Sequence, residues 1–329
     1  MKKIMLSLTL SALLTLSACG GGQSASPAPE DDTLHILATT YPVYLFTTAV
    51  TEGVEGVEVS RLIQQEISCL HDYTLTVNDM KAVEAADVVV LNGVGLEDFL
   101  SDALAASDAP VIDCSEGVEL LPALGHEGHD HDTEYDPHIW MEPARAAQMV
   151  ENIRAGLTQA DPDRAERYAG NASDAAARLA NAGTTLREIT ASGQPGLPLP
   201  QRELITFHDG FQYFAEAFGL DLLKAIEEEE GSEASAAEIK EIVGLVRDFD
   251  IPAIFTEKNG SDATAQAISR ETGCQVCQLD LIMSGDGQGL DPYLTALEGN
   301  VETIANALGE GQVQMNGGSA HSHERTQAR

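Results

Sequence analysis

The sequence predicts an α/β protein with parallel sheets. Short apolar strand candidates alternate with helix candidates over residues 34–114, and the same alternation returns over residues 203–308. Such βα alternation is typical of a doubly wound, parallel sheet. Between the two stretches lies a long, Ala-rich helix candidate with few strand signals on either side. We therefore expect two α/β halves separated by a helical connector.

Residues 1–19 have the pattern of an export signal. A short basic start precedes an apolar stretch that is too short for a permanent membrane helix. The stretch ends in LSACG, which resembles a bacterial lipobox and makes Cys19 the predicted lipidated first residue of the mature chain. An ordinary signal peptide with an incidental cysteine is the alternative. Residues 20–32 are rich in Gly, Ser, Pro and acids, which predicts a flexible tether.

In the first half, strand and helix candidates follow one another in order. DVVVLN is a continuous apolar run of the kind that is buried on both faces of a parallel sheet. Thr76 opens a helix whose apolar side chains recur at helical spacing. The strand candidates are Leu34–Thr39, Val57–Ile63, Asp87–Asn92 and Pro110–Cys114, and the other helix candidates are residues 42–51 and Leu96–Leu104.

The connector and the second half continue the pattern. Pro143 begins a helix that Asp161-Pro162 ends, and Asp163 caps a second helix to about Thr190. Four phenylalanines after residue 206 recur at the spacing of one buried helix face. The further candidates are the strands Glu203–Thr206, Ala253–Thr256 and Gln275–Leu279, and the helices Ser235–Phe249, Asp262–Thr272 and Pro292–Leu308. Residues 313–329 have no core-forming content and predict a disordered tail.

The chain is strongly acidic, with 53 Asp and Glu against 18 Lys and Arg and a formal net charge of −35. This surface makes nucleic acid an implausible partner. Its field attracts cations, although charge alone defines no specific site. The run Glu227–Glu230 is expected to be a solvated surface segment.

Four cysteines follow Cys19, and an even number in an exported protein allows disulfides. Cys69 and Cys114 fall in the first half, while Cys274 and Cys277 fall in the second. Pairing within each half is the simplest expectation. A second CxxC is missing, and no thioredoxin-like helix start follows Cys277, so a ribbon-type zinc site and a redox motif both have weak support.

Three histidines and one aspartate follow strand candidates, two in each half. They are His71 in SCLHDY, His138 in YDPHIW, His208 in TFHDGF and Asp280 in QLDLIM. Ligands of doubly wound sheets bind outside the carboxyl ends of the strands. A single histidine of this kind is more often a packed or capping residue, but three imidazoles and a carboxylate can fill the tetrahedral shell of a zinc ion. The sequence therefore predicts a metal site between the two halves.

The order of six segments resembles one family. ATTYPVYLFT, HDYTLT, DPHIWMEP, FHDGFQYFAEAFGL, IFTE and LDLIMSG are similar to the corresponding segments of the zinc and manganese solute-binding proteins of ABC importers, the cluster A-I family. The resemblance covers essentially the whole mature chain. It implies two Rossmann-like lobes with parallel sheets, residues 33–145 and 193–312, joined by a long connecting helix within residues 146–192. A single divalent ion is expected in the cleft between the lobes.

The resemblance also bears on individual residues. The family's first ligand histidine usually follows Glu-Pro, whereas here Cys69-Leu70 precedes His71, so this loop differs and Cys69 is a candidate for pinning it. Family members with His at the third ligand position resemble zinc receptors, and those with Glu resemble manganese receptors. His208 therefore favours zinc, with manganese as the runner-up. Glu257 in IFTE is a candidate partner for a ligand imidazole.

The loop GHEGHDHDT contains His126, His129 and His131, where zinc-binding relatives carry a longer His-rich insertion. Low-affinity metal capture and a merely solvated loop are equally compatible with it.

The implied function is a monomeric lipoprotein, anchored on the outer face of the cytoplasmic membrane, that delivers zinc to an ABC permease and its ATPase. An enzyme is the main alternative from another class. However, HExxH and GxSxG are both missing, and a shell of four protein ligands leaves no open position for a substrate. An adhesin with the same fold is a third alternative.

Overall fold

The computed structural model describes residues 33–65, 70, 73–124, 134–192, 199, 201–226 and 234–309. Thr33 begins the compact body of the chain. The predicted signal peptide with Cys19, the tether and the C-terminal tail lie outside the described residues. Cys69, His71 and the loop with His126, His129 and His131 also lie outside them. No described helix is long and apolar enough to cross a membrane.

The first lobe contains a four-stranded parallel sheet of order β2-β1-β3-β4. The continuous apolar run predicted to be a buried strand forms β3, of which the first three residues are buried. Thr76 caps α2 in a reciprocal capping box with Asp79, as the sequence pattern predicts. The elements are β1 (Leu34–Ala38), α1 (Tyr41–Val50), β2 (Val57–Arg61), α2 (Val77–Ala85), β3 (Val88–Leu91), the 3-10 turn η1 (Asp98–Leu100), α3 (Ser101–Ala105) and β4 (Val111–Asp113).

The second lobe repeats this arrangement, with a parallel sheet of order β6-β5-β7-β8. In both sheets the first strand in sequence lies between the second and the third. The elements are β5 (Glu203–Thr206), α6 (Gln212–Phe218), β6 (Asp221–Ala225), α7 (Ala236–Asp248), β7 (Ala253–Glu257), α8 (Ala263–Thr272), β8 (Gln275–Leu279) and α9 (Asp291–Leu308). The predicted fold class is therefore confirmed.

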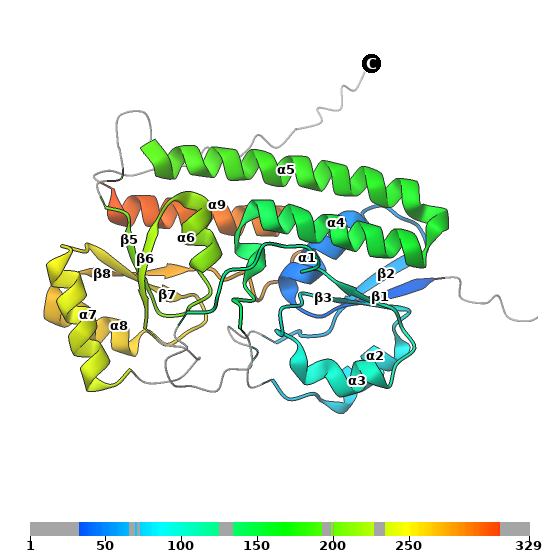
Figure 1. Ribbon diagram of the computed structural model, residues 1–329, viewed down its shortest axis with the longest axis horizontal. Coiled ribbons are helices and arrows are strands. Elements are labelled where there is room, and N and C mark those ends of the chain that lie inside the picture. The colour runs from blue at the N-terminus through cyan, green and yellow to red at the C-terminus, as the bar shows by residue number, and fades with distance from the viewer. Residues whose placement is uncertain are drawn as a thin grey trace, which may run out of the picture. The chain divides into compact units, whose positions relative to one another are not determined.

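Two helices connect the lobes. After η2 (Ile139–Met141), α4 (Pro143–Ala160) runs to a short turn, η3 (Pro162–Arg164), and α5 (Ala165–Ser192) returns antiparallel to it. α5 is Ala-rich and contains no proline, so its backbone hydrogen bonds continue uninterrupted over 28 residues. It packs on α1 of the first lobe and on α6 and α9 of the second, and Figure 1 shows it extending over both sheets.

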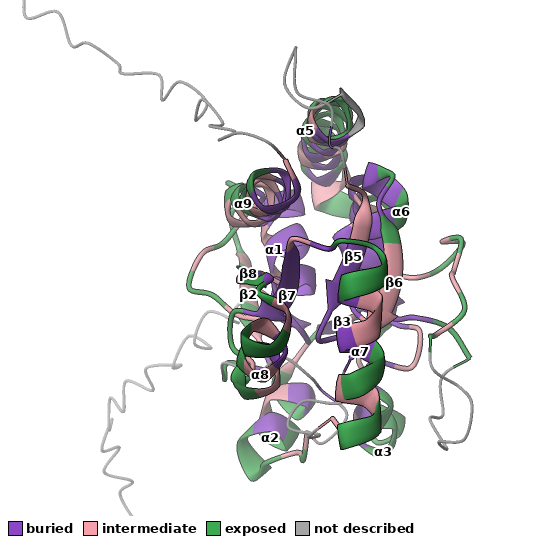
Figure 2. Ribbon diagram, turned by 90° about the vertical axis from the view of Figure 1, so that its left-hand side faces the viewer, coloured by how far each residue is buried: buried purple, intermediate pink, exposed green. Residues whose placement is uncertain are grey.

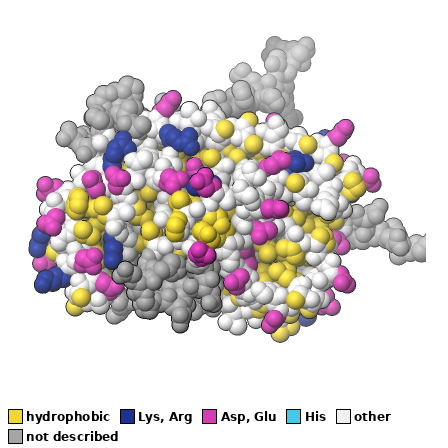
Figure 3. Space-filling view, viewed as in Figure 1, with side chains coloured by type: hydrophobic (Ala, Val, Ile, Leu, Met, Phe, Trp, Pro, Cys, Tyr) yellow, Lys and Arg dark blue, Asp and Glu magenta, His cyan; other side chains and the backbone are white. Residues whose placement is uncertain are grey.

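One large hydrophobic core runs through both lobes. It includes the strands of the first sheet, α4, α5, part of α6 and α9, and buries Trp140 and Tyr293 completely. A smaller cluster fills the space between the second sheet and the helices α7 and α8. Figure 2 shows the buried residues concentrated on the sheets and on the inner faces of the long helices. On the face shown in Figure 3, acidic side chains are spread over the surface rather than gathered in one patch.

The structure corrects three predictions about individual elements. β6 was not predicted, because DLLKA has no clear period-2 pattern and a run of acids follows one residue later. Phe207 and Phe211 precede α6, so only the later part of the phenylalanine pattern is helical. His138 does not directly follow a strand; the described residues 134–137 before it are irregular, apart from an isolated bridge between Tyr135 and Pro122.

The expected pairing of Cys274 with Cys277 is wrong, because both carry free thiols; Cys114 is also a free thiol, and Cys69, its expected partner, lies outside the described residues. Cys277 lies on β8 and Cys274 directly precedes that strand. Three residues of extended chain span about 10 Å, beyond the Cα separation of about 7 Å that a disulfide can bridge. Cys114 is fully buried, and desolvation raises the pKa of its thiol well above the usual range.

Candidate metal centre

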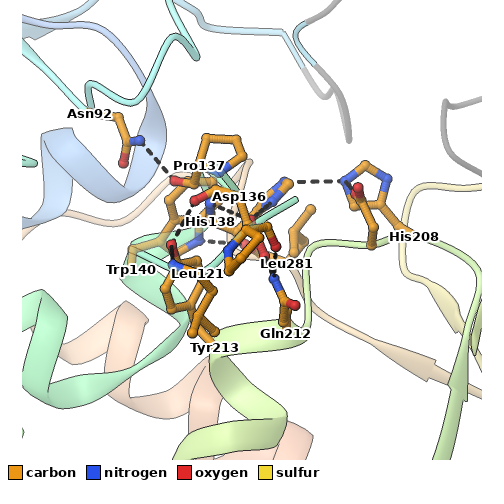
Figure 4. A network of polar contacts seen from close by, with 12 residues as sticks. Asn92, Leu121, Asp136, Pro137, His138, Trp140, His208, Gln212, Tyr213 and Leu281 are labelled. Carbon is orange, nitrogen blue, oxygen red and sulfur yellow. Dashed lines mark hydrogen bonds and ion pairs between the residues drawn. The ribbon is translucent and has the colours of Figure 1, made fainter. Parts of the chain in front are cut away.

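The two predicted histidines within the described residues meet between the lobes. His208 lies two residues beyond β5, and His138 lies directly before η2. Their Nε2 atoms are 3.2 Å apart and their rings are perpendicular (Figure 4). Both residues are buried, at 6% and 5% exposure for His138 and His208 respectively. Residues separated by 70 positions in the sequence thus present the same ring nitrogen to one point.

A buried carboxylate lies near the other ring nitrogen of each histidine. Asp136 Oδ1 lies 2.7 Å from His138 Nδ1 and also accepts the main-chain N–H of His138 at 2.8 Å. In the second lobe, Glu257 Oε1 at the end of β7 lies 3.3 Å from His208 Nδ1. A carboxylate at Nδ1 orients the imidazole and leaves the Nε2 lone pair to bind a metal. Both rings therefore have the arrangement of metal ligands.

The segment around His138 is fixed by side chains of the second lobe. Tyr213 donates a hydrogen bond to the main-chain oxygen of Asp136, and Gln212 donates to the Asp136 carboxylate. Trp140 Nε1 donates to the main-chain oxygen of Leu281, beside Asp280, and Tyr293 donates to the oxygen of Trp140. These contacts join the lobes directly at the histidine pair, so the Nε2 spacing is set by the packed core.

A third potential ligand in this group is Asp209, which the sequence analysis missed. One ligand atom from each of His138, His208 and Asp209 lies within 4.8 Å of the other two. Asp209 Oδ1 is 3.5 Å from His208 Nε2. Its position directly after His208 in FHDGF was the available signal. Asp136, two residues before His138, was missed in the same way.

Asp280 follows β8 directly, but its carboxylate is turned to other partners. Oδ2 lies 3.1 Å from Lys258 Nζ, and Oδ1 accepts the main-chain N–H of Ile282. The buried Asn300 on α9 holds the main chain of Asp280 through both its N–H and its C=O. Asp280 lines a pocket of about 630 Å³ together with Lys258 and Tyr41. The structure thus fixes the main chain of Asp280, while its carboxylate faces Lys258 and Ile282.

The electrostatics of the pair favour a cation. Burial by itself lowers the pKa of His138, but the Asp136 carboxylate, with Asp209 and Glu257, raises it overall. These three acids lie around two imidazole nitrogens that can be neutral and bind a metal. This arrangement suits a divalent ion. The spacing also fits, because two nitrogens on one tetrahedral zinc at about 2.0–2.1 Å lie about 3.3 Å apart. The Nε2 separation in the structure is 3.2 Å.

Two α/β lobes that meet around carboxylate-held imidazoles define a two-lobed binding protein for a metal ion. Comparison with known proteins is consistent with this class. The family model described as "Zinc-uptake complex component A periplasmic" (ZnuA) matches residues 36–307. The chain belongs to this family.

Individual relatives carry different metals in their names. The chain is 26% identical over 315 residues to the manganese-binding lipoprotein MntA of Halalkalibacterium halodurans, covering 94% of this chain and all of the relative. It is 30% identical over 319 residues to the zinc-binding lipoprotein AdcA of Streptococcus pneumoniae, covering 92% of this chain. The matched part is only 60% of AdcA. The names of these relatives describe metal binding and no catalytic activity.

Solved structures share the fold. A crystal structure of ZnuA superposes with a TM-score of 0.71 at 28% identity, covering 84% of this chain and 99% of that one. The laminin-binding protein Lbp of Streptococcus pyogenes superposes with a TM-score of 0.71 at 26% identity and covers the same shares. A protein named for binding laminin therefore shares this fold, as the adhesin alternative requires.

Proposed function

We propose that this protein binds zinc outside the cytoplasm and delivers it to an ABC permease and its ATPase. The observation that carries the proposal is the pair of Nε2 atoms of His138 and His208, 3.2 Å apart, each with a buried carboxylate at the opposite ring nitrogen. Imidazole donors suit zinc better than manganese, which prefers oxygen ligands. The names of AdcA and of the family support zinc, while that of MntA keeps manganese as the runner-up.

The remaining ligands are proposed as His71 and Asp280, on the resemblance of HDYTLT and LDLIMSG to the family's segments. Asp209 is a second candidate for the oxygen ligand, because it already lies in one group with the histidines. Replacing Asp209 and Asp280 separately with Asn distinguishes them. The variant that loses the greater zinc affinity identifies the ligand.

Metal choice is tested by titrating the mature protein, stripped of metal, with zinc and with manganese in the presence of a competing chelator. The proposal expects one zinc per chain and an affinity for zinc well above that for manganese. Tighter binding of manganese would show a manganese receptor, and binding of neither ion would refute the proposed function.

The membrane anchor is proposed from the lipobox ending at Cys19, and MntA and AdcA are named as lipoproteins. Cys19→Ala is expected to release the protein from the membrane fraction or to stall its processing. Membrane retention equal to that of the unmodified sequence would argue against lipidation. Low-affinity capture by His126, His129 and His131 stays a separate prediction, tested by zinc stoichiometry after deletion of residues 125–133.

A further inference from the structure

Glu97, a buried carboxylate, lies at the carboxyl ends of strands in the first sheet. At the corresponding place in the second sheet lies His208. Glu97 is 5% exposed, and its Oε1 accepts hydrogen bonds from Thr39 Oγ1 at 2.6 Å and from the main-chain N–H of Asn92 at 2.8 Å. Its Oε2 accepts the N–H of Gly93 at 3.1 Å. Thr39 directly follows β1 and Asn92 directly follows β3. Glu97 therefore joins the carboxyl ends of two neighbouring strands.

This position is where a doubly wound sheet usually binds a ligand. β1 and β3 are adjacent, and the connections from them leave the sheet toward opposite edges, which leaves a crevice at their carboxyl ends. The equivalent strands of the second sheet are β5 and β7, and there His208 and Glu257 face each other. At the corresponding strand ends of the first lobe, the Glu97 carboxylate makes the contacts.

The turn between β3 and Glu97 is conformationally strained. Gly93, Val94 and Gly95 all have positive φ, at 85°, 57° and 77°. Positive φ is unfavourable for a β-branched residue such as Val94, and it persists only where the surroundings hold it. The Glu97 carboxylate holds the start of this turn through the N–H groups of Asn92 and Gly93. The turn is thus kept in one conformation by the acid that follows it.

The side chain of Asn92 connects this turn to the metal centre. Asn92 is completely buried, and its Nδ2 donates to the main-chain oxygens of Pro137 at 2.9 Å and of Gly93 at 3.1 Å. Pro137 directly precedes His138, and Figure 4 shows the contact beside the two imidazoles. One continuous series of hydrogen bonds therefore leads from Glu97 through Asn92 to the peptide that carries the ligand.

We infer that Glu97 is a positioning residue for metal binding: it fixes Asn92, and through Asn92 it holds the main chain at Pro137 so that His138 Nε2 stays directed at His208. This inference rests on the proposed function. It explains why a charged group is buried at the end of the first sheet without touching the histidines.

The pH dependence of zinc affinity distinguishes a positioning role of Glu97 from a merely structural one. Burial raises its pKa to about 7; the hydrogen bonds from Thr39, Asn92 and Gly93 oppose this shift and Asp113 adds to it. Glu97 also influences the buried Cys114 thiol, which stays neutral because its own pKa is raised. The ionised carboxylate accepts these three hydrogen bonds more strongly than the neutral acid does. The connection to Pro137 is therefore tightest above pH 7.

The test uses Glu97→Gln, Asn92→Ala and the double variant, with zinc and a competing chelator as the probe. Each single change is expected to lower zinc affinity about 10-fold, the lower end of the loss on removing an outer partner of a ligand. The double variant should lose no more than the worse single variant, because both changes break the same series of contacts. The ratio of wild-type to Glu97→Gln affinity should be larger at pH 8 than at pH 6.

Asp161→Asn is the matched control. Asp161 is also a buried carboxylate, but it accepts from Arg164 and Tyr168 at the turn between α4 and α5. It should lower the melting temperature without changing zinc affinity. Either of two results overturns the inference. One is a double variant whose loss of zinc affinity equals the sum of the two single losses. The other is unchanged zinc affinity at pH 8 in folded Glu97→Gln and Asn92→Ala.

A second measurement separates this inference from the proposed function. The imidazole NMR signals of His138 in metal-free protein should shift in Glu97→Gln and in Asn92→Ala, and should be unchanged in Asp161→Asn. A protein that binds no zinc but shows these shifts refutes the function and retains the positioning role. Unshifted His138 signals in both variants refute the positioning role even where zinc binds normally.

Discussion

The two lobes share one strand order but treat the ends of their strands differently. In the second lobe, His208 follows the central strand β5 and meets Glu257 from its neighbour β7. In the first lobe, the corresponding crevice contains Glu97, and the ligand candidate His138 comes from an irregular segment ahead of α4. The lobes thus repeat the fold without repeating the site. Strand topology locates one imidazole, and tertiary packing brings the other to it.

Both imidazoles nevertheless have a carboxylate near the same ring nitrogen. Each has a buried carboxylate at Nδ1, but the partner of His138 is two residues away and makes two contacts, at 2.7 and 2.8 Å. The partner of His208 comes from a neighbouring strand and lies at 3.3 Å. A local partner and a distant partner can therefore serve the same purpose, and we expect the local one to hold its ring more firmly.

The largest effects should come from the imidazoles themselves. His138→Ala and His208→Ala should each lower zinc affinity by more than about 100-fold, because loss of a group that only orients a ligand already costs about 10- to 100-fold. Chelator competition measures the change. His35→Ala, at a partly exposed histidine at the start of β1, is the control and should bind zinc normally. If only one of the two variants lost zinc affinity, the other histidine would not be a zinc ligand, and the two lobes would not share one site.

The carboxylates should have the next largest effects. Asp136→Asn and Glu257→Gln should each lower zinc affinity about 10- to 100-fold. The loss should be greater for Asp136→Asn, because Asp136 holds both the ring and the main chain of His138. Isothermal titration of both variants at one pH makes the comparison. The reverse order would show that the distant partner orients its ring more strongly than the local one.

Glu97 should give the first lobe a pH-dependent stability. Its pKa is raised from 4.5 to about 7 in the folded protein, a difference worth about 3 kcal/mol. The stability from its bound proton is fully present below pH 4.5 and is lost as the pH rises through 7. Denaturant unfolding of metal-free wild type and Glu97→Gln between pH 4.5 and 8 should show the stability difference shifting in favour of the variant. Parallel curves would place the Glu97 pKa near its ordinary value.

The smallest effect concerns whether the second lobe supplies a further ligand. Lys258 pairs with Asp280, and an ion pair with so exposed a lysine contributes at most about 1 kcal/mol. If Asp280 binds zinc, Lys258→Met should raise the affinity by up to about 5-fold, because the carboxylate no longer has a competing cation. Lys224→Met, which removes a similar pair with Glu241, is the control. Unchanged affinity in both Lys258→Met and Asp280→Asn would exclude Asp280.

Most of the fold could be predicted from the sequence because local signals agree with the final structure. The strands Glu203–Thr206 and Gln275–Leu279 have the predicted bounds, and Ser235 caps α7 in a capping box with Glu238. β6 lacked such a signal: its residues are only partly buried, so no alternation of apolar and polar side chains marks it. Edge strands of this kind depend on pairing with their neighbour.

The site could be predicted only in part. His208 and Glu257 lie at strand ends, where topology gathers ligands, and their contact agrees with the predicted pairing of Glu257 with a ligand imidazole. His138 was selected for the wrong reason, since no strand directly precedes it. Asp136 and Asp209 were missed although each lies within two residues of a selected histidine. Their roles depend on side-chain direction, which the spacing of residues in the sequence does not specify.

The central claim is that His138 and His208 bind one zinc ion through their Nε2 atoms. X-ray absorption at the zinc edge of protein loaded with one zinc equivalent tests it most directly. The predicted spectrum has nitrogen and oxygen neighbours at about 2.0–2.1 Å and outer-shell signals of at least two imidazole rings, which are lost in part in His138→Ala and in His208→Ala. A sulfur shell at about 2.3 Å, or imidazole signals unchanged in both variants, would contradict the claim.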